Sequence, residues 1–401
     1  MSILALVPSR GLTMDFQLSD DQQAISESVD RLCARFDDAY WLDHDSSGDF
    51  PFEFHRAIAD AGYLGIAMPE EYGGSGLGVT EAALMMHRVA KSPGAMSACS
   101  SIHINIFGPH PIVVFGNDEQ RARWLPDLVE GKLFCCFGVT EPDSGLNTTK
   151  LRTRAERSGN GYVVNGRKVW TTTAQEASKI MLLARTTPIE DCQRPTDGLS
   201  LFYTDLNREF CDVRVIDKMG RKAVDSNEVF IDGLPVPAED LIGEEGKGFR
   251  YLLHSLNPER ILVGLEAVGI GQQAVDRAAR YAREREVFDR PIGQNQAIQH
   301  PLAESWMELE AAYLMAMKGA AMYDAGLACG AEANAAKYLG AEAGFKACTR
   351  AVMTHGGMGY AREFHVERLM REVMICRIAP VSPQLILCYI AERVLDLPRS
   401  Y

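Results

Sequence analysis

The chain has 401 residues, of which 46% are hydrophobic, so it can bury a large core and is long enough for two or three domains. Its 41 Lys and Arg residues against 54 Asp and Glu give a formal net charge of −13, which disfavours nucleic acid or an anionic membrane surface as a partner. These values predict a soluble, folded protein whose ligands are small molecules.

Residues 1–13 contain one short apolar run and no basic start, which predicts neither a signal peptide nor a membrane span and makes Met14 a candidate functional start. The ten cysteines follow neither a metal-binding nor a secreted-scaffold spacing. They favour buried, reduced thiols and a cytoplasmic location, with no metal site.

From residue 20 to about 130 the chain has the apolar periodicity of helices. After the acidic, capping-type segment LSDD, apolar residues recur at steps of three and four, namely Ala24, Ile25, Val29 and Leu32. Residues 69–78, PEEYGGSGLG, indicate a loop. We therefore predict an N-terminal helical domain over residues 14–133.

The pattern changes near Phe134. Short apolar or alternating runs follow, separated by turn signals such as SGNG, and they include YVVNGRKVWTT, KIMLLART, LSLFYTD and EVFIDGL. These runs predict a β domain over residues 134–243. From residue 244 to 401 the chain is helical again, with long periodic runs at 250–285, 303–326, 331–354 and 383–396.

Four segments carry candidate functional residues, and each also has a purely structural interpretation. FGVTEPDSG (137–145) is suited to presenting backbone N–H groups to a polar ring or phosphate, but equally fits a strand-to-turn junction. VWTTT (169–173) offers an aromatic face beside hydroxyls, although an aromatic residue in a strand is more often core. HGGMG (355–359) and REREVFDRPIGQNQ (283–296) also fit a common glycine turn and a solvated helix end.

In combination these segments are far more specific. MDFQLSDDQQ, PEEYGGSGLG, GVTEPDSG, VWTTT, EEGKGF, REREVFDRPIGQNQAIQ and HGGMGY occur in the order and at the spacings of the acyl-CoA dehydrogenase family, which the chain resembles from Met14 to the C-terminus. The resemblance implies an α+β fold with an N-terminal α-helical domain, a central β-barrel-like domain and a C-terminal four-helix bundle. It also implies FAD at their junction and a homotetramer assembled as paired dimers.

The resemblance assigns cofactor contacts residue by residue. At the flavin edge it implies Phe137, Val139, Thr140, Trp170 and Thr172, with the Trp170 ring near the isoalloxazine and the Thr172 hydroxyl near N5. At the FAD of a neighbouring subunit it implies Arg285, Phe288, Gln296, Gly356 and Gly357, and it adds Ser382 and Gln384 as cofactor contacts. The family usually has serine where Leu146 stands and an amide where Met353 stands.

The loop after Ile378 holds Pro380 where most of the family has a glutamate that removes the α-proton of the thioester. Proline can neither accept a proton nor donate a backbone N–H, and in the family that N–H usually helps to polarise the thioester carbonyl. The flavin ribityl hydroxyl and the N–H of Val381 are the remaining candidates for this second role.

Members resembling the isovaleryl-CoA and long-chain types carry the catalytic glutamate on the first long helix of the C-terminal bundle, and the matching residue is Glu259. The local pattern agrees, because Leu252, Leu256, Glu259 and Val263 place one carboxylate in an apolar helical stripe. Desolvation there should raise its pKa from about 4.3 toward neutrality, as a base for a carbon-bound proton requires. The alternative is a glutamate paired with an arginine across the bundle.

The sequence is thus interpreted as an FAD-dependent acyl-CoA dehydrogenase that forms a trans-2 double bond and passes electrons to an electron-transfer flavoprotein. Asn257 and Arg260 match positions that bind CoA in the family, which usually has aspartate at the first. Ala379 replaces a frequent tyrosine and favours a branched or unusual acyl chain. The alternatives are a flavin-dependent oxidase, monooxygenase or enoyl-CoA reductase on the same fold, or a catalytically silent FAD-binding homologue.

Overall fold

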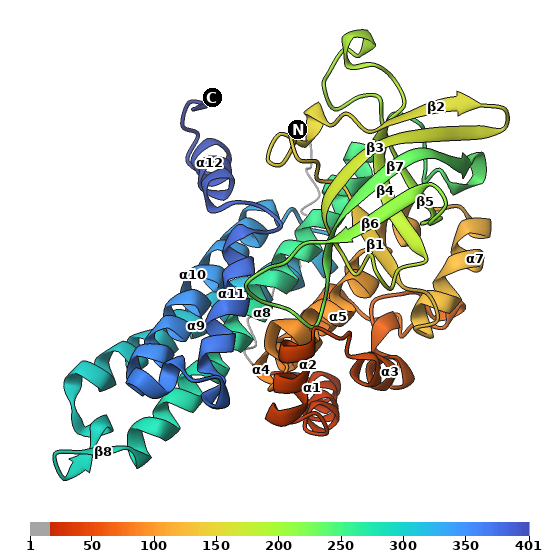
Figure 1. Ribbon diagram of the computed structural model, residues 1–401. Helices are drawn as coiled ribbons and strands as arrows, with labels where there is room; N and C mark the ends of the chain where they lie inside the picture. Colours follow the sequence, from red (N-terminus) through yellow and green to blue (C-terminus); the bar gives the residue numbers. More distant parts are fainter. Residues whose placement is uncertain (1–16, 401) are drawn as a thin grey trace.

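The computed structural model describes residues 17–400, so the predicted start at Met14 lies outside the described residues. The first part is helical, as predicted (Figure 1). Ser19 caps the first helix, because its side chain accepts the N–H of Gln22 while the Gln22 side chain bonds to the Ser19 backbone. The helices are α1 (Asp20–Cys33), α2 (Asp38–Ser47), α3 (Phe52–Asp60), α4 (Val79–Lys91), α5 (Ala95–Phe107), α6 (His110–Phe115) and α7 (Asp118–Val129).

The middle part is a curled sheet with the order β1-β4-β2-β3-β7-β6, and β5 pairs with β4. Its strands are β1 (Cys135–Gly138), β2 (Arg154–Ser158), β3 (Gly161–Thr172), β4 (Lys179–Arg185), β5 (Leu199–Asp205), β6 (Cys211–Val215) and β7 (Ser226–Pro237). Strand β4 runs parallel to β1 and β2, whereas the other pairs are antiparallel. Each of the four apolar runs predicted to be strands is one, and β1, β2 and β6 are additional.

The last part is a bundle of long helices that extends away from the sheet (Figure 1). It consists of α8 (Gly248–Glu284), α9 (Gln296–Asp324), α10 (Gly330–His355) and α11 (Val366–Ile378), and α12 (Pro383–Arg393) follows it. A small hairpin of β8 (Glu286–Val287) and β9 (Arg290–Pro291) lies at its far end. Helix α9 begins earlier than the predicted 303, because Pro301 lies inside the helix and does not break it. The predicted α+β class is confirmed.

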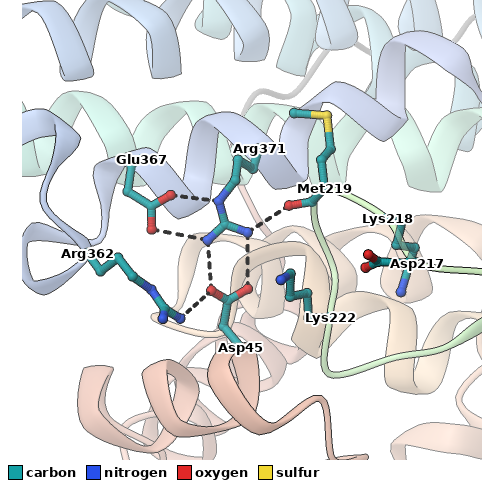
Figure 2. A pocket seen from close by; sticks show the side chains of 8 residues that line it. All are labelled: Asp45, Asp217, Lys218, Met219, Lys222, Arg362, Glu367 and Arg371. Atoms are coloured by element: carbon teal, nitrogen blue, oxygen red, sulfur yellow. Dashed lines mark hydrogen bonds and ion pairs between the residues drawn. The ribbon is translucent and has the colours of Figure 1, made fainter.

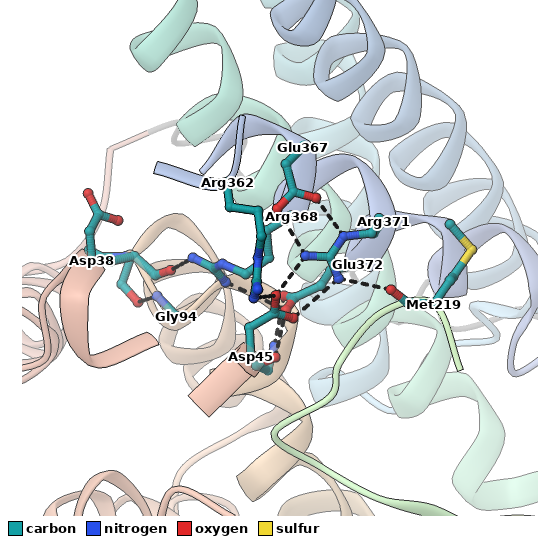
Figure 3. A network of polar contacts seen from close by, with 12 residues as sticks. Asp38, Asp45, Gly94, Met219, Arg362, Glu367, Arg368, Arg371 and Glu372 are labelled. Carbon is teal, nitrogen blue, oxygen red and sulfur yellow. Dashed lines mark hydrogen bonds and ion pairs between the residues drawn. The ribbon is translucent and has the colours of Figure 1, made fainter. Parts of the chain in front are cut away.

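An ion-pair cluster ties the three parts together (Figure 3). Asp45 of α2 accepts hydrogen bonds from Arg371 Nη1 and Nη2 at 3.2 and 2.7 Å and from Arg362 Nη2 at 3.1 Å. Arg371, on α11, also donates to Glu367 at 2.6 Å and to the carbonyl oxygen of Met219 at 2.8 Å. Since Met219 lies between β6 and β7, one guanidinium connects the N-terminal helices, the sheet and the bundle.

A hollow of about 620 Å³ adjoins this cluster and is lined by the same five residues with Asp217, Lys218 and Lys222 (Figure 2). Neither Glu259 nor any predicted flavin contact lines it, so we assign it neither the acyl nor the flavin site. Within residues 17–400, no single helix is long and apolar enough to cross a membrane; α11 and α12 together meet that criterion by length and composition, with a bend of 42° between them.

Candidate active site

The residues predicted at the flavin edge come from two segments that the fold places side by side. Phe137 lies in β1, and Val139 and Thr140 follow that strand. The N–H of Val169 in β3 donates to the carbonyl oxygen of Thr140 at 2.9 Å. This bond joins the segment 137–140 to the strand that carries Trp170 and Thr172.

A buried ion pair also joins these two segments. Lys168 Nζ donates to Glu141 Oε1 at 2.9 Å and to the Val139 carbonyl oxygen at 3.2 Å. Glu141 also accepts the N–H groups of Arg152 and Thr153 at 2.6 and 2.9 Å. Burial lowers the pKa of Lys168 to about 8. Burial acts to raise the pKa of Glu141, but the Lys168 charge and the hydrogen bonds outweigh it and leave that pKa lowered.

Trp170 and Thr172 form an open, ligand-ready surface. Trp170 lies within a bulge of β3, has φ of 61° and leaves 57% of its surface exposed, an unusual conformation and exposure for a large aromatic residue. The Thr172 hydroxyl has no hydrogen-bond partner within residues 17–400, and the neighbouring Thr171 and Thr173 hydroxyls are buried without one. An exposed ring beside unpaired hydroxyls fits a flat, polar-edged cofactor.

The FAD contacts predicted for a neighbouring subunit lie elsewhere, around the far end of the bundle that carries the β8–β9 hairpin (Figure 1). Arg285 is the C-cap of α8, Phe288 lies in the turn of the β8–β9 hairpin and is 93% exposed, and Gln296 is the first residue of α9. Gly356 and Gly357 join them, because the ring of His355 stacks on that of Tyr281 in α8 at 4.3 Å. This second group thus belongs to the bundle, whereas Trp170 and Thr172 belong to the sheet.

Glu259 lies on α8, in an apolar stripe whose Leu252 and Val263 are buried, while Leu256 and Glu259 itself are half-buried. Burial raises its pKa to about 7, against the charges of His103, Arg260 and Lys337. Its Oε2 is buried without a hydrogen-bond partner among the described residues. Within residues 17–400, Glu259 therefore forms no ion pair with an arginine across the bundle, which was the alternative. The direction of the pKa shift is the one expected for a base.

A second buried pair stands close to this carboxylate. His103 Nδ1 on α5 is 2.6 Å from Oε1 of Glu266, which lies two helical turns after Glu259 on α8. Burial acts to lower the pKa of His103, but the Glu266 charge and hydrogen bond, with the Glu259 charge, leave it raised. The His103 ring contacts Phe107, and Phe107 contacts Phe137 of the flavin edge, with centroid distances of 4.6 and 5.6 Å.

The other predicted contacts are placed as follows. Arg260 Nη1 donates to Asn257 Oδ1 at 2.9 Å, while Arg260 Nε is buried without a hydrogen-bond partner within residues 17–400. Ser382 caps α12 by accepting the N–H of Leu385. Gln384 is exposed on the first turn of α12. No group of three or more His, Cys, Asp or Glu residues in the described chain is arranged to hold a metal ion.

Lys168, His103 and Lys337 were not predicted from the sequence, although each bonds to a predicted site residue or acts on one through its charge. For Lys168 a signal was present, since the alternation of GYVVNGRKVW puts this lysine on the inward face with Tyr162 and Val164. His103 and Lys337 gave none, because their partners lie on other helices.

Comparison with known proteins identifies the family and supports the fold. Models of the acyl-CoA dehydrogenase N-terminal, middle and C-terminal domains match residues 19–132, 136–234 and 246–395. The chain belongs to the acyl-CoA dehydrogenase family. It is an FAD-dependent oxidoreductase that acts on the CH–CH bond of acyl-CoA thioesters.

Three relatives illustrate the range of this family. Acyl-CoA dehydrogenase FadE12 of Mycobacterium tuberculosis is 35% identical over 395 residues, covering 96% of this chain and 98% of the relative. A 3-(aryl)acrylate reductase of Clostridium sporogenes is 33% identical over 88% of this chain and 92% of its own. The solved glutaryl-coenzyme A dehydrogenase–glutaryl-CoA complex has a TM-score of 0.91 at 29% identity, covering 96% of this chain and 98% of that one.

Proposed function

We propose that Glu259 removes the α-proton when this dehydrogenase converts an acyl-CoA thioester to the trans-2-enoyl-CoA. The observation that carries the proposal is the buried Glu259 carboxylate, which has a pKa of about 7 and an Oε2 without a partner in the described chain. A desolvated carboxylate with a pKa near neutrality is both ionised and basic enough to take a proton from carbon. When bound, FAD supplies the acceptor for the hydride that leaves the β-carbon.

Other side chains would bind and orient the ligands. Phe137, Val139, Thr140, Trp170 and Thr172 would line the flavin edge, because they form one surface from two joined segments. Asn257 and Arg260 would bind the CoA moiety, since Arg260 retains an unpaired donor in the described chain one residue from the base. Ser382 and Gln384 would add cofactor contacts at the start of α12.

The assembly that we propose is a homotetramer of paired dimers in which Arg285, Phe288, Gln296, Gly356 and Gly357 hold the FAD of a neighbouring subunit. Their place on the bundle rather than on the sheet supports this, as does the exposure of Phe288 and of Tyr360, which is 88% exposed. An electron-transfer flavoprotein would accept the electrons. The ten free cysteines support a cytoplasmic location. The domain boundaries 14–133, 134–243 and 244–401 remain our proposal.

The experiment is an anaerobic titration of the bound flavin with straight, branched and dicarboxylic acyl-CoAs. Flavin bleaching by at least one of them is the expected result, with a branched or unusual acyl group preferred because Ala379 leaves space at a frequent tyrosine position. No bleaching by any of the compounds would favour the catalytically silent homologue.

One alternative activity has a specific observation in its favour. The relative from Clostridium sporogenes carries the name of a reductase, so the same fold is associated with the reverse direction. An enoyl-CoA reductase would reoxidise chemically reduced flavin on addition of an enoyl-CoA faster than an acyl-CoA reduces it. Rapid reoxidation by O2 would instead favour an oxidase or a monooxygenase.

A further inference from the structure

Lys337 is a buried cation that holds the loop in which Pro380 replaces the usual glutamate. Lys337 lies on α10 and is completely buried. Its Nζ donates a hydrogen bond to the carbonyl oxygen of Val381 at 2.6 Å. It forms no ion pair within residues 17–400. A buried ammonium is costly without an anionic partner, and a methionine of similar length would fill the same space at lower cost. Packing alone therefore does not explain a lysine at this position, and the charge itself needs a role.

The packing of α8 against α10 brings Lys337 to the base. At Gly264 and Gly340 the two helices touch backbone to backbone. A Cβ on Gly264 would lie 2.8 Å from the carbonyl oxygen of Ala336 and 3.2 Å from the backbone nitrogen of Lys337. Gly264 is five residues after Glu259 on the same helix. The positive charge of Lys337 acts to lower the pKa of Glu259. One side chain thus bonds to the loop that replaces the usual glutamate and acts electrostatically on the base.

Lys337 and the start of α12 together fix one peptide group of this loop. Lys337 holds the carbonyl oxygen of Val381, and Ser382 is held on the other side of the peptide as the N-cap of α12. In a planar trans peptide the N–H points opposite to the C=O, so the Ser382 N–H is directed away from Lys337. Neither the Val381 N–H nor the Ser382 N–H donates to a protein acceptor in the described chain.

We propose that Lys337 is a positioning residue that locks the Val381–Ser382 peptide so that the free N–H groups of Val381 and Ser382 bind the thioester carbonyl oxygen of the substrate. This inference rests on the proposed function, because it assumes that Glu259 and the loop face the same acyl-CoA. It supplies the donor that Pro380 cannot provide. No bond to Lys337 itself is made or broken during the reaction.

The chemistry of α-proton removal explains why such a donor is needed. As the proton leaves, negative charge develops on the thioester oxygen, and donors that are already in place stabilise that charge without reorganisation. A cation on the carbonyl side of a peptide also polarises it, which makes the N–H of the same peptide a stronger donor. Lys337 would therefore both aim the Ser382 N–H and strengthen it.

The test compares Lys337→Met with Lys346→Met in the FAD-loaded enzyme. Lys346 lies on the same helix but forms an exposed pair with Glu308 at 2.6 Å, which makes it a matched control. The readouts are FAD content, kcat and KM, and the infrared stretch of a ¹³C-labelled thioester carbonyl in bound 2-enoyl-CoA. Carbonyl polarisation is reported directly by this stretch, which a purely structural role of Lys337 would not move.

Lys337→Met should retain FAD, lower kcat about tenfold or more with little change in KM, and lose much of the carbonyl shift to lower frequency that the wild type shows. Lys346→Met should match the wild type. A full carbonyl shift with kcat within about twofold of wild type in Lys337→Met would overturn the inference. If this variant loses FAD, Lys337→Gln, which keeps a polar donor, is measured by the same criteria.

The result for Lys337 is separable from the result for the proposed function. Glu259→Gln should keep the full carbonyl shift while turnover is lost, because it leaves the Val381–Ser382 peptide intact. Failure of every acyl-CoA to bleach the wild-type flavin would instead refute the proposed reaction, whatever Lys337 does.

Discussion

Replacing Lys168 with methionine should destabilise the protein by about 3 kcal/mol, because it leaves the Glu141 carboxylate buried without its cation. Both side chains are almost completely inaccessible, and their atoms are 2.9 Å apart. Removing one partner of such a pair costs roughly 3–5 kcal/mol. The lower end applies here, because Glu141 keeps the N–H groups of Arg152 and Thr153 as donors.

Two further variants separate the charge from the change in side-chain shape. The double variant Lys168→Met, Glu141→Gln removes the unpaired charge and should recover about half of the loss. Lys318→Met breaks an exposed pair with Glu332 at 3.1 Å and should cost less than about 1 kcal/mol. The assay is urea unfolding of the FAD-loaded protein at pH 7. A cost below about 1 kcal/mol for Lys168→Met, or a double variant less stable than the single, would refute this reasoning.

Two other predictions concern the pH dependence of catalysis and the ion-pair cluster around Asp45 and Arg371. Because Glu259 must be ionised to accept a proton, kcat/KM should rise as the pH increases through about 7, and a profile without an acid limb would contradict its role. Asp45→Asn should cost roughly 2 kcal/mol, since it breaks a partly buried cluster. Burial acts to raise the pKa of Asp45, but Arg371 outweighs it and leaves that pKa below 3.8, so this contribution is present at neutral pH and lost as the pH falls through the folded-state pKa. Equal destabilisation by Asp45→Asn at neutral and strongly acidic pH would refute that assignment.

Local signals account for the elements that the sequence predicted. The start of α1 follows from a capping box, which involves only residues 19–22. The strands β3, β4, β5 and β7 have strong apolar or alternating runs because at least one face of each is buried. Strand β1 escaped prediction because it has only 4 residues, β2 because only Ala155 of its residues is buried, and β6 because it is a short edge strand of alternating charge. None of the three has a pattern that a single sequence can distinguish from a loop.

The candidate site likewise contains one residue that local sequence signals identify and others that they do not. Glu259 could be found from sequence because an ionisable residue inside an apolar helical stripe is visible along one element. The groups that face it could not, since His103 is 163 residues from Glu266 in the chain and Lys337 reaches the loop across 44 residues. Which helices touch is decided by the packing of the whole bundle, including the backbone contact at Gly264 and Gly340.

The claim that Glu259 removes the α-proton is tested most directly by the anaerobic rate of flavin reduction in Glu259→Gln. The variant should keep FAD and bind acyl-CoA, and at pH 8 it should be no less stable than the wild type, because it replaces a buried ionised carboxylate with a neutral amide. The reduction rate should fall by roughly 10³-fold or more, since position 380 holds no second carboxylate. A rate above about a tenth of the wild-type value, which is a barrier increase below roughly 1.4 kcal/mol, would remove Glu259 as the base.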